Sequence, residues 1–156
     1  MRSPRATRQD GRRRGSYPHI AFTFLGYTFR PRGVRTKTGT MMTGFNPAIS
    51  RDALTKIGAR VRSWRLHRRT DLSAADLARW VNPIVRGWMN YYGAFYRSAL
   101  YPLLARINAY PMRWLRNKYT RLRGRKLAQR AWAEAVATRP RYFAHWVWVP
   151  TVPAVW

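Results

Sequence analysis

Cysteine is absent from this sequence, and acidic residues are scarce. The lack of cysteine excludes disulfide bonds and thiolate metal sites. Only five Asp and Glu stand against 31 Lys and Arg, which gives a net charge of +26. No run of about 18 apolar residues occurs, so no segment is expected to span a membrane. A compact chain with this charge repels itself unless anions neutralise it. Nucleic acid is therefore the first expected partner.

Groups that would support catalysis are also missing. Metal-dependent nucleotidyl transfer needs at least two convergent carboxylates, and the acids here are scattered along the chain: Asp10, Asp52, Asp71, Asp76 and Glu134. The sequence has no Gly-rich phosphate loop and no nucleophile elbow. Its three histidines lie far apart, and His145 beside Phe143 and Trp146 indicates a packing residue. We therefore expect no catalytic residue, no metal site and no cofactor.

The apolar content predicts a folded chain of mainly α class. Hydrophobic residues make up 46% of the sequence, too much for a disordered polycation. Residues 1–16 are the exception, because six Arg and few apolar residues predict a disordered basic arm. Within 17–49, alternation over 22–29 predicts a strand with a bulge at Gly26, and 40–45 a second strand. Together they predict a small β-hairpin.

Helices are expected from residue 50 onward. Ser50 is a good N-cap for a helix over 51–66, whose apolar stripe lies within about 80° of arc. Ser73 and Asp76 form the pattern of a capping box, which predicts a second, short helix reaching Val81. The pair Asn82-Pro83 predicts an N-cap and first turn, so a new helix is expected there.

A long apolar stripe begins near Leu100. Leu103, Leu104, Ile107, Tyr110 and Trp114 share this stripe, with Arg106, Arg113 and Arg116 across from it. Pro111 is expected to kink or split the helix near Ala109. Helix is expected to continue through 113–130, and a last short helix follows over 127–137. Residues 139–156 contain three prolines and predict an irregular apolar tail.

The segment RGWMNYYGAFYR, residues 86–97, concentrates five aromatic rings. At helical spacing Trp88, Tyr91 and Phe95 share one apolar face, which favours core packing over base stacking. Tyr92 and Tyr96 lie at the boundary, where both interpretations stay open. The polar face carries Arg86, Asn90 and Arg97, and few acids exist to pair with them. Unpaired cations in helical rows suit phosphate contacts.

Seven segments in order carry a family resemblance: YPHIAFTFLGYTFRPR, NPAIS, SWRLHRR, DLARWVNPIVRGWMNYYG, FYRSALYPLL, KYTRLRGRK and FAHW. Over residues 12–146 the chain resembles the C-terminal part of group II intron reverse transcriptase/maturases. In that family a Tyr-x-Asp-Asp box lies in a catalytic palm upstream of the FLGY strand, and this sequence contains no such box. The resemblance thus implies the thumb and maturase-specific domain without the palm.

What the resemblance implies is a non-enzymatic maturase fragment that binds group II intron RNA and assists its splicing, the intron being the ribozyme. It assigns 17–49 to the end of the palm, 50–81 to thumb-like helices and 82–138 to a maturase-specific helical domain. With the helical patterns it gives these RNA-binding candidates: Arg60, Arg62, Arg86, Asn90, Tyr92, Arg97, Arg106, Arg113, Arg116, Lys118, Arg121, Arg123, Arg125 and Lys126.

Two alternatives stay open at this stage. The chain could be the thumb half of a split reverse transcriptase, which would need a separate palm subunit docked on the FTFLGY strand. It could also be a generic basic RNA-binding protein without preference for intron structure. A membrane-surface protein is the weakest option, because the apolar stripes are expected to pack within the domain. The expected compartment is the bacterial cytoplasm, although the sequence leaves the compartment open.

Overall fold

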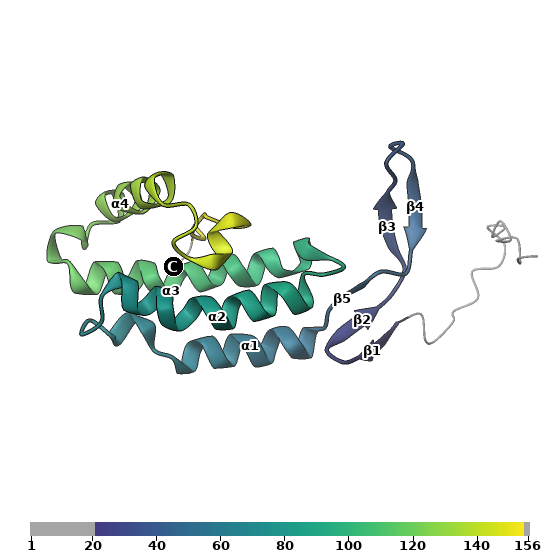
Figure 1. The fold of residues 1–156 in the computed structure, drawn as a ribbon, viewed down its shortest axis with the longest axis horizontal. Helices are drawn as coiled ribbons and strands as arrows, with labels where there is room; N and C mark the ends of the chain where they lie inside the picture. The colour runs from purple at the N-terminus through teal and green to yellow at the C-terminus, as the bar shows by residue number, and fades with distance from the viewer. Residues whose placement is uncertain (1–20, 155–156) are drawn as a thin grey trace, which may run out of the picture.

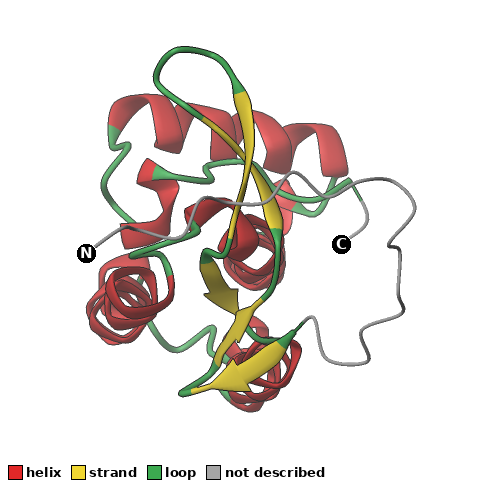
Figure 2. Ribbon diagram, turned by 90° about the vertical axis from the view of Figure 1, so that its right-hand side faces the viewer, coloured by secondary structure: helices red, strands yellow, loops and turns green. Residues whose placement is uncertain are grey.

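The structure, a computed structural model, describes residues 21–154. It is mainly α, with a set of short antiparallel strands before the helices, as expected (Figure 1). The helices are α1 (Arg51–Ser63), α2 (Ala74–Tyr92), α3 (Tyr101–Lys118) and α4 (Arg125–Thr138). Helices α1, α2 and α3 lie side by side, and α4 runs across the bundle on the side of α3 (Figures 1 and 2). The last described segment packs against α2. The arm expected over 1–16 lies outside the described residues.

Five strands form two small sheets rather than one hairpin. They are β1 (Phe22–Phe24), β2 (Tyr27–Phe29), β3 (Arg32–Arg35), β4 (Met41–Gly44) and β5 (Pro47–Ile49). The first sheet has the order β1-β2-β5, and the second is the β3-β4 pair; all neighbours are antiparallel. The bulge expected at Gly26 is wrong. Leu25 (φ 49°) and Gly26 (φ 81°) instead form a turn that reverses the chain between β1 and β2.

Both expected helix starts with side-chain caps are confirmed. The Ser50 hydroxyl accepts a hydrogen bond from the Ala53 amide (3.1 Å), and α1 ends at Ser63, three residues before the expected end. At α2, the Ser73 hydroxyl accepts from the Asp76 amide (3.1 Å). The Asp76 carboxylate accepts from the Ser73 amide (3.0 Å), which completes the capping box.

Pro83 does not start a new helix and Pro111 does not split one, whereas the kink that was the other expected outcome at Pro111 stays a prediction. Pro83 lies inside α2, which runs unbroken from Ala74 to Tyr92, so the boundary expected at 81/82 falls within one helix. Asn82 is therefore not an N-cap; its side chain donates to the Tyr142 carbonyl (2.9 Å) and accepts from the Ala144 amide (2.8 Å). Pro111 likewise lies inside a continuous α3. The helix expected to continue through 113–130 is interrupted after Lys118 by the 3-10 turn η3 (Thr120–Leu122).

The core fills the space between helices α1, α2 and α3. Helix α2 buries Leu77, Val81, Val85 and Met89, which are spaced four residues apart. Helix α3 buries Leu103, Leu104, Ile107 and Trp114 of the expected stripe, and Tyr110 is half-buried. The last described segment is irregular, as expected, but it also closes the core: Phe143, His145 and Trp146 of the turn at η4 (Ala144–Val147) and its N-cap are buried.

The aromatic segment at the end of α2 differs from the expected core face. Trp88 is half-buried and stacks on Trp64 (5.7 Å between ring centroids, 6° between planes). Tyr91 and Phe95 are 46% and 63% exposed, and Phe95 lies beyond the end of α2 at Tyr92. A side chain at the next residue, Gly93, would place its Cβ 2.4 Å from the Met89 carbonyl oxygen and 2.6 Å from the Trp148 ring.

These rings instead hold the β1-β2-β5 sheet against α2. Tyr27 is buried, and its ring centroid lies 5.2 Å from Tyr91, 5.7 Å from Tyr92 and 5.8 Å from Phe95. The Tyr27 hydroxyl donates to the Tyr91 carbonyl, and the Tyr91 hydroxyl donates to the Leu25 carbonyl (3.0 Å). These rings therefore neither pack in the centre of the core nor stand free for base stacking. They dock the sheet on the helix bundle.

Candidate nucleic-acid interface

Helices α1 and α3 both end at the end of the bundle opposite the strands (Figure 1). The last turns of both helices carry arginines. Four residues of α3 and the following turn line one surface hollow: Arg113, Arg116, Asn117 and Arg123. The Arg116 Nε donates to the Arg123 carbonyl (2.8 Å), which folds η3 back onto α3. Asn117 Nδ2 donates to the His67 carbonyl (2.8 Å) and joins the hollow to η1 (Leu66–Arg68).

His67 reports on the charge density at this place. Its pKa is lowered from the usual 6.5, first by burial and then by the positive charges of Arg68, Arg113 and Arg65. The ring lies 6.5 Å from that of Tyr110 on α3. Cations that are far apart in the sequence, Arg65 and Arg68 before α2 and Arg113 on α3, therefore lie close enough to His67 to act on its ring. We call this set the basic end; it consists of Arg65, Arg68, Arg113, Arg116 and Arg123.

Few carboxylates compensate this charge. Between described residues there are two ion pairs, Arg69–Asp71 at 3.3 Å and Arg79–Asp76, and both use the acids of the connector and the capping box. Asp52 lies in the first turn of α1, at the other end of that helix. No three His, Asp or Glu side chains among residues 21–154 come together in a way that could hold a metal ion. The basic end can therefore attract anions, and phosphates of a nucleic acid fit it.

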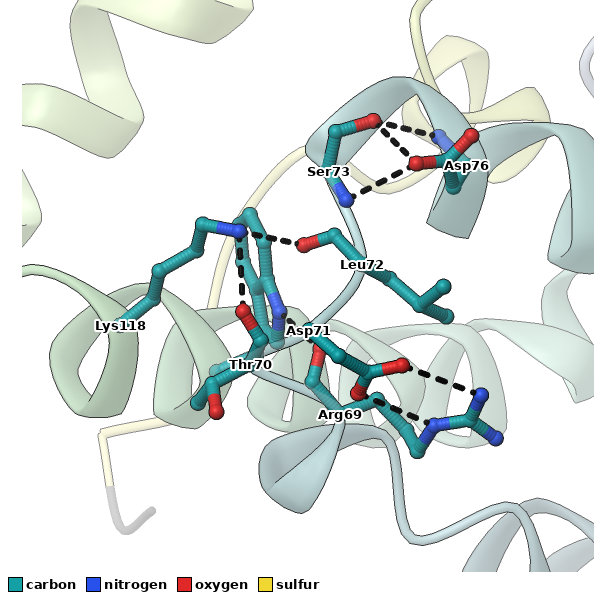
Figure 3. Close-up of polar contacts among 8 residues, drawn as sticks. Arg69, Thr70, Asp71, Leu72, Ser73, Asp76 and Lys118 are labelled. Atoms are coloured by element: carbon teal, nitrogen blue, oxygen red, sulfur yellow. Dashed lines mark hydrogen bonds and ion pairs between the residues drawn. The ribbon is translucent and has the colours of Figure 1, made fainter.

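The connector between η1 and α2 is fixed from α3 (Figure 3). The Lys118 ammonium donates to the carbonyls of Leu72 (2.6 Å) and Thr70 (3.0 Å), and it lies 5.4 Å from the centre of the Trp114 ring. The indole of Trp114 donates to the Arg69 carbonyl (2.8 Å). Lys118 was a sequence-predicted RNA contact, and in the structure its ammonium holds the backbone that carries Arg68 and Arg69.

Other predicted residues are spread over the bundle. Arg62 and Arg106 are exposed and lie near Gly58: the Arg62 Nη1 would be 3.8 Å from a Cβ there, and Arg106 lines a shallow hollow with Gly58. Together with Arg113 they extend the basic end along the α1/α3 surface. Arg60 is also exposed. At roughly 100° per residue it lies about 160° around α1 from Arg62, which is the opposite side of that helix.

The remaining candidates fall into two groups. Arg121, Arg125 and Lys126 are exposed beside the basic end in sequence, and Arg125 also donates to the Ala154 carbonyl. Arg86 and Asn90 are exposed on α2, whereas Tyr92 is half-buried against Tyr27. Arg97 lies at the strand end of the bundle with its guanidinium 4.6 Å from the Trp148 ring centre. The structure thus does not bring Arg86, Asn90, Tyr92 and Arg97 to the basic end.

Sequence reasoning missed Arg65, Arg68 and Asn117. Arg65 and Arg68 mark the end of a helix in the sequence, and only the left-handed conformation of Arg65 (φ 49°) turns η1 back towards α3. Asn117 follows Arg113 by four residues, so the helical spacing was the available signal for it.

Comparison with known protein families decides the relationship. Residues 54–132 match the group II intron, maturase-specific domain family, which is more than half of the chain. The chain belongs to this family. No curated protein and no solved structure gave a match. A maturase-specific domain alone is not a catalytic domain.

The matched residues include most of α1 and all of η1, α2, α3 and η3. The basic end therefore lies wholly within the maturase-specific domain, whereas the five strands and the last segment lie outside it. The match also spans position 82, where the sequence reasoning had separated thumb-like helices from the maturase-specific domain. No helix in the described part of the chain is long and apolar enough to cross a membrane.

Proposed function

We propose that this chain binds group II intron RNA through the basic end and assists splicing by holding the folded intron. The observation that carries the proposal is the gathering of Arg65, Arg68, Arg113, Arg116 and Arg123 within the maturase-specific domain. The role of the protein is then electrostatic and geometric, because the intron RNA supplies the chemistry of splicing.

The fixed connector supports this proposal. Arginine side chains contact phosphates most effectively when the backbone that carries them is already in place, since less conformational entropy is lost on binding. Trp114, Asn117 and Lys118 supply four hydrogen bonds to carbonyls of residues 67–72. The spacing between Arg68 and Arg113 is therefore set by the fold before the RNA arrives.

Binding and splicing assays on the full chain test the proposal. The double variant Arg113→Glu/Arg123→Glu should retain the fold, because both side chains are exposed, and it should bind a group II intron RNA more weakly. Each lost phosphate contact should reduce the slope of log K against log salt by about 1. The control is Arg130→Glu/Arg141→Glu, which changes the charge equally at exposed positions elsewhere. Equal affinities for the two double variants would refute a role for the basic end.

Competition separates a maturase from a generic basic RNA-binding protein. A maturase should keep the intron RNA bound in the presence of excess bulk RNA and should accelerate splicing of that intron. Loss of binding to a modest excess of bulk RNA, with no effect on splicing, would support the generic protein.

A second candidate, the thumb half of a split reverse transcriptase, is favoured by one observation. Among residues 21–154, β1 pairs with β2 alone and no described strand lies along its other edge, and Phe22 and Phe24 of β1 are 57% and 62% exposed. An open apolar edge suits strand addition by another polypeptide. Primer extension should then need both this chain and a separately expressed palm with a Tyr-x-Asp-Asp box. We expect no extension by this chain alone with Mg²⁺ and a primed RNA template.

A further inference from the structure

The β3-β4 hairpin stands away from the helix bundle and has almost no core of its own (Figures 1 and 2). Cross-strand pairs run from Arg32 with Gly44 to Arg35 with Met41. Met41 and Met42 are 66% and 59% exposed, and no residue of either strand is buried. A two-stranded hairpin of this kind is only marginally stable in isolation. Contacts with groups outside the hairpin are therefore expected to stabilise it.

Its composition points to a polyanion. Residues 30–44 contain Arg30, Arg32, Arg35 and Lys37 with four threonines, and no acidic residue occurs between positions 21 and 51. The Arg35 Nη2 would lie 3.8 Å from a Cβ at Gly39, in the turn at the tip, so both Arg35 and Lys37 place charge there. This charge is distant in the chain from the basic end.

The hairpin is nevertheless anchored at its base by Arg32, and hydrogen bonds within the tip order the turn there. Arg32 Nη1 donates to the carbonyls of Asn46 (2.7 Å) and Thr28 (3.2 Å), and its guanidinium lies 5.3 Å from the Tyr96 ring centre. At the tip, the Thr36 amide donates to the Thr40 carbonyl and the Gly39 amide to the Thr36 carbonyl, both at 2.9 Å. The Thr36 hydroxyl also accepts from the Thr40 amide (3.1 Å). Arg32 is thus an anchor, whereas Arg35 and Lys37 are presented outward.

We propose that the β3-β4 hairpin is a second RNA-binding element, separate from the basic end, and that it binds double-helical RNA along its backbone. This proposal rests on the proposed function. Residues 30–44 contain no Phe, Tyr or Trp, so the hairpin offers no ring on which an unpaired base could stack. Cations and hydroxyls match what an RNA duplex displays, which is phosphates and the 2′-hydroxyls of its shallow minor groove. The hairpin therefore recognises shape rather than base sequence.

The test uses the double variant Arg35→Glu/Lys37→Glu of the full chain. Binding is measured over a range of salt concentrations with an RNA duplex and with a single strand of equal length and without secondary structure. We expect the slope of log K against log salt for the duplex to decrease by about 2, one for each lost phosphate contact. The slope for the single strand should change much less. Thermal unfolding should match wild type, since both side chains are exposed.

The control is again Arg130→Glu/Arg141→Glu, which carries the same change in net charge. A tip variant that matches this control in affinity and slope on the duplex would overturn the inference, and so would an equal loss on duplex and single strand. Either result leaves the proposed function standing if Arg113→Glu/Arg123→Glu still weakens binding of the intron RNA. If that variant also binds like the control, it is the proposed function that fails.

Discussion

Replacing Asn108 by Leu should strongly destabilise the domain, because this one side chain ties the last segment to α3. Asn108 is fully buried, and its Nδ2 donates to the carbonyls of Val149 (2.9 Å) and Thr151 (2.8 Å). Its Oδ1 accepts from Nε2 of His145 (2.6 Å) and from the indole of Trp146 (3.0 Å). Since Oδ1 is an acceptor, Nε2 of His145 carries the proton.

The magnitude follows from these four bonds. A typical bond contributes about 1 kcal/mol net, and a buried group left without a partner costs about 1–3 kcal/mol. Leucine keeps the volume but leaves His145 and Trp146 with buried donors, so a loss of about 4–6 kcal/mol is expected. Single domains are stable by about 5–15 kcal/mol, so the variant should be close to unfolding.

A matched variant tests whether the number of bonds sets the cost. Asn82 also ties the last segment to the bundle, but it is only half-buried and makes two bonds, to Tyr142 and Ala144. Asn82→Leu should therefore cost about half as much. Urea unfolding followed by tryptophan fluorescence reports both, because Trp146 contacts Trp132 at 4.9 Å between centroids. A cost below about 1 kcal/mol for Asn108→Leu, or equal costs for the two variants, would refute the reasoning.

Three further predictions concern stability. Burial lowers the pKa of His145 from 6.5 to about 3, so the unfolded chain takes up a proton at a higher pH than the folded chain. The stability that comes from keeping His145 neutral is complete above pH 6.5, and the free energy of unfolding should drop by about 2 kcal/mol by pH 5. In His145→Gln, the free energy of unfolding measured in urea should depend less on pH. Lys118→Met should cost about 1–3 kcal/mol in urea unfolding, because it removes two charge-assisted bonds to the connector; no loss would mean that the connector is held without it. Trp88→Ala should lower the thermal midpoint but cost less than the roughly 3–5 kcal/mol of a fully buried ring, because Trp88 is half-buried; an unchanged midpoint with lost RNA affinity would make it a stacking platform.

The local signals in the sequence were sufficient wherever the cause is local. Ser50, Ser73 and Asp76 cap helices through contacts within three residues, so their pattern is visible in the sequence. The prolines show the opposite case. An interior proline costs about 3 kcal/mol locally, but α2 buries Leu77, Val81, Val85 and Met89 on both sides of Pro83. Burial of a continuous face outweighs that cost, and it depends on partners that the local sequence does not reveal.

Distant contacts also explain what was missed at the end of α2 and at the site. The helix ends at Tyr92 beside Gly93, whose position is crowded by Trp148 from the far end of the described chain. Arg68 and Arg113 both lie near His67 because Asn117 bonds to the His67 carbonyl and Lys118 bonds to the connector, a pairing across about a third of the chain. Helical periodicity placed Arg106 and Arg113 on one surface, but it could not bring η1 to them.

The contacts of Asn82 and Asn108 also impose an order on biosynthesis. Their partners in residues 142–151 lie 37 to 62 positions further along the chain. A ribosome that has just finished α1, α2 and α3 has not yet made the residues that cover them, so the nascent bundle leaves Asn108 and its apolar neighbours in contact with solvent. Completion of the domain is therefore a late event in translation, and a nascent chain paused before residue 142 leaves apolar surface exposed, which favours aggregation.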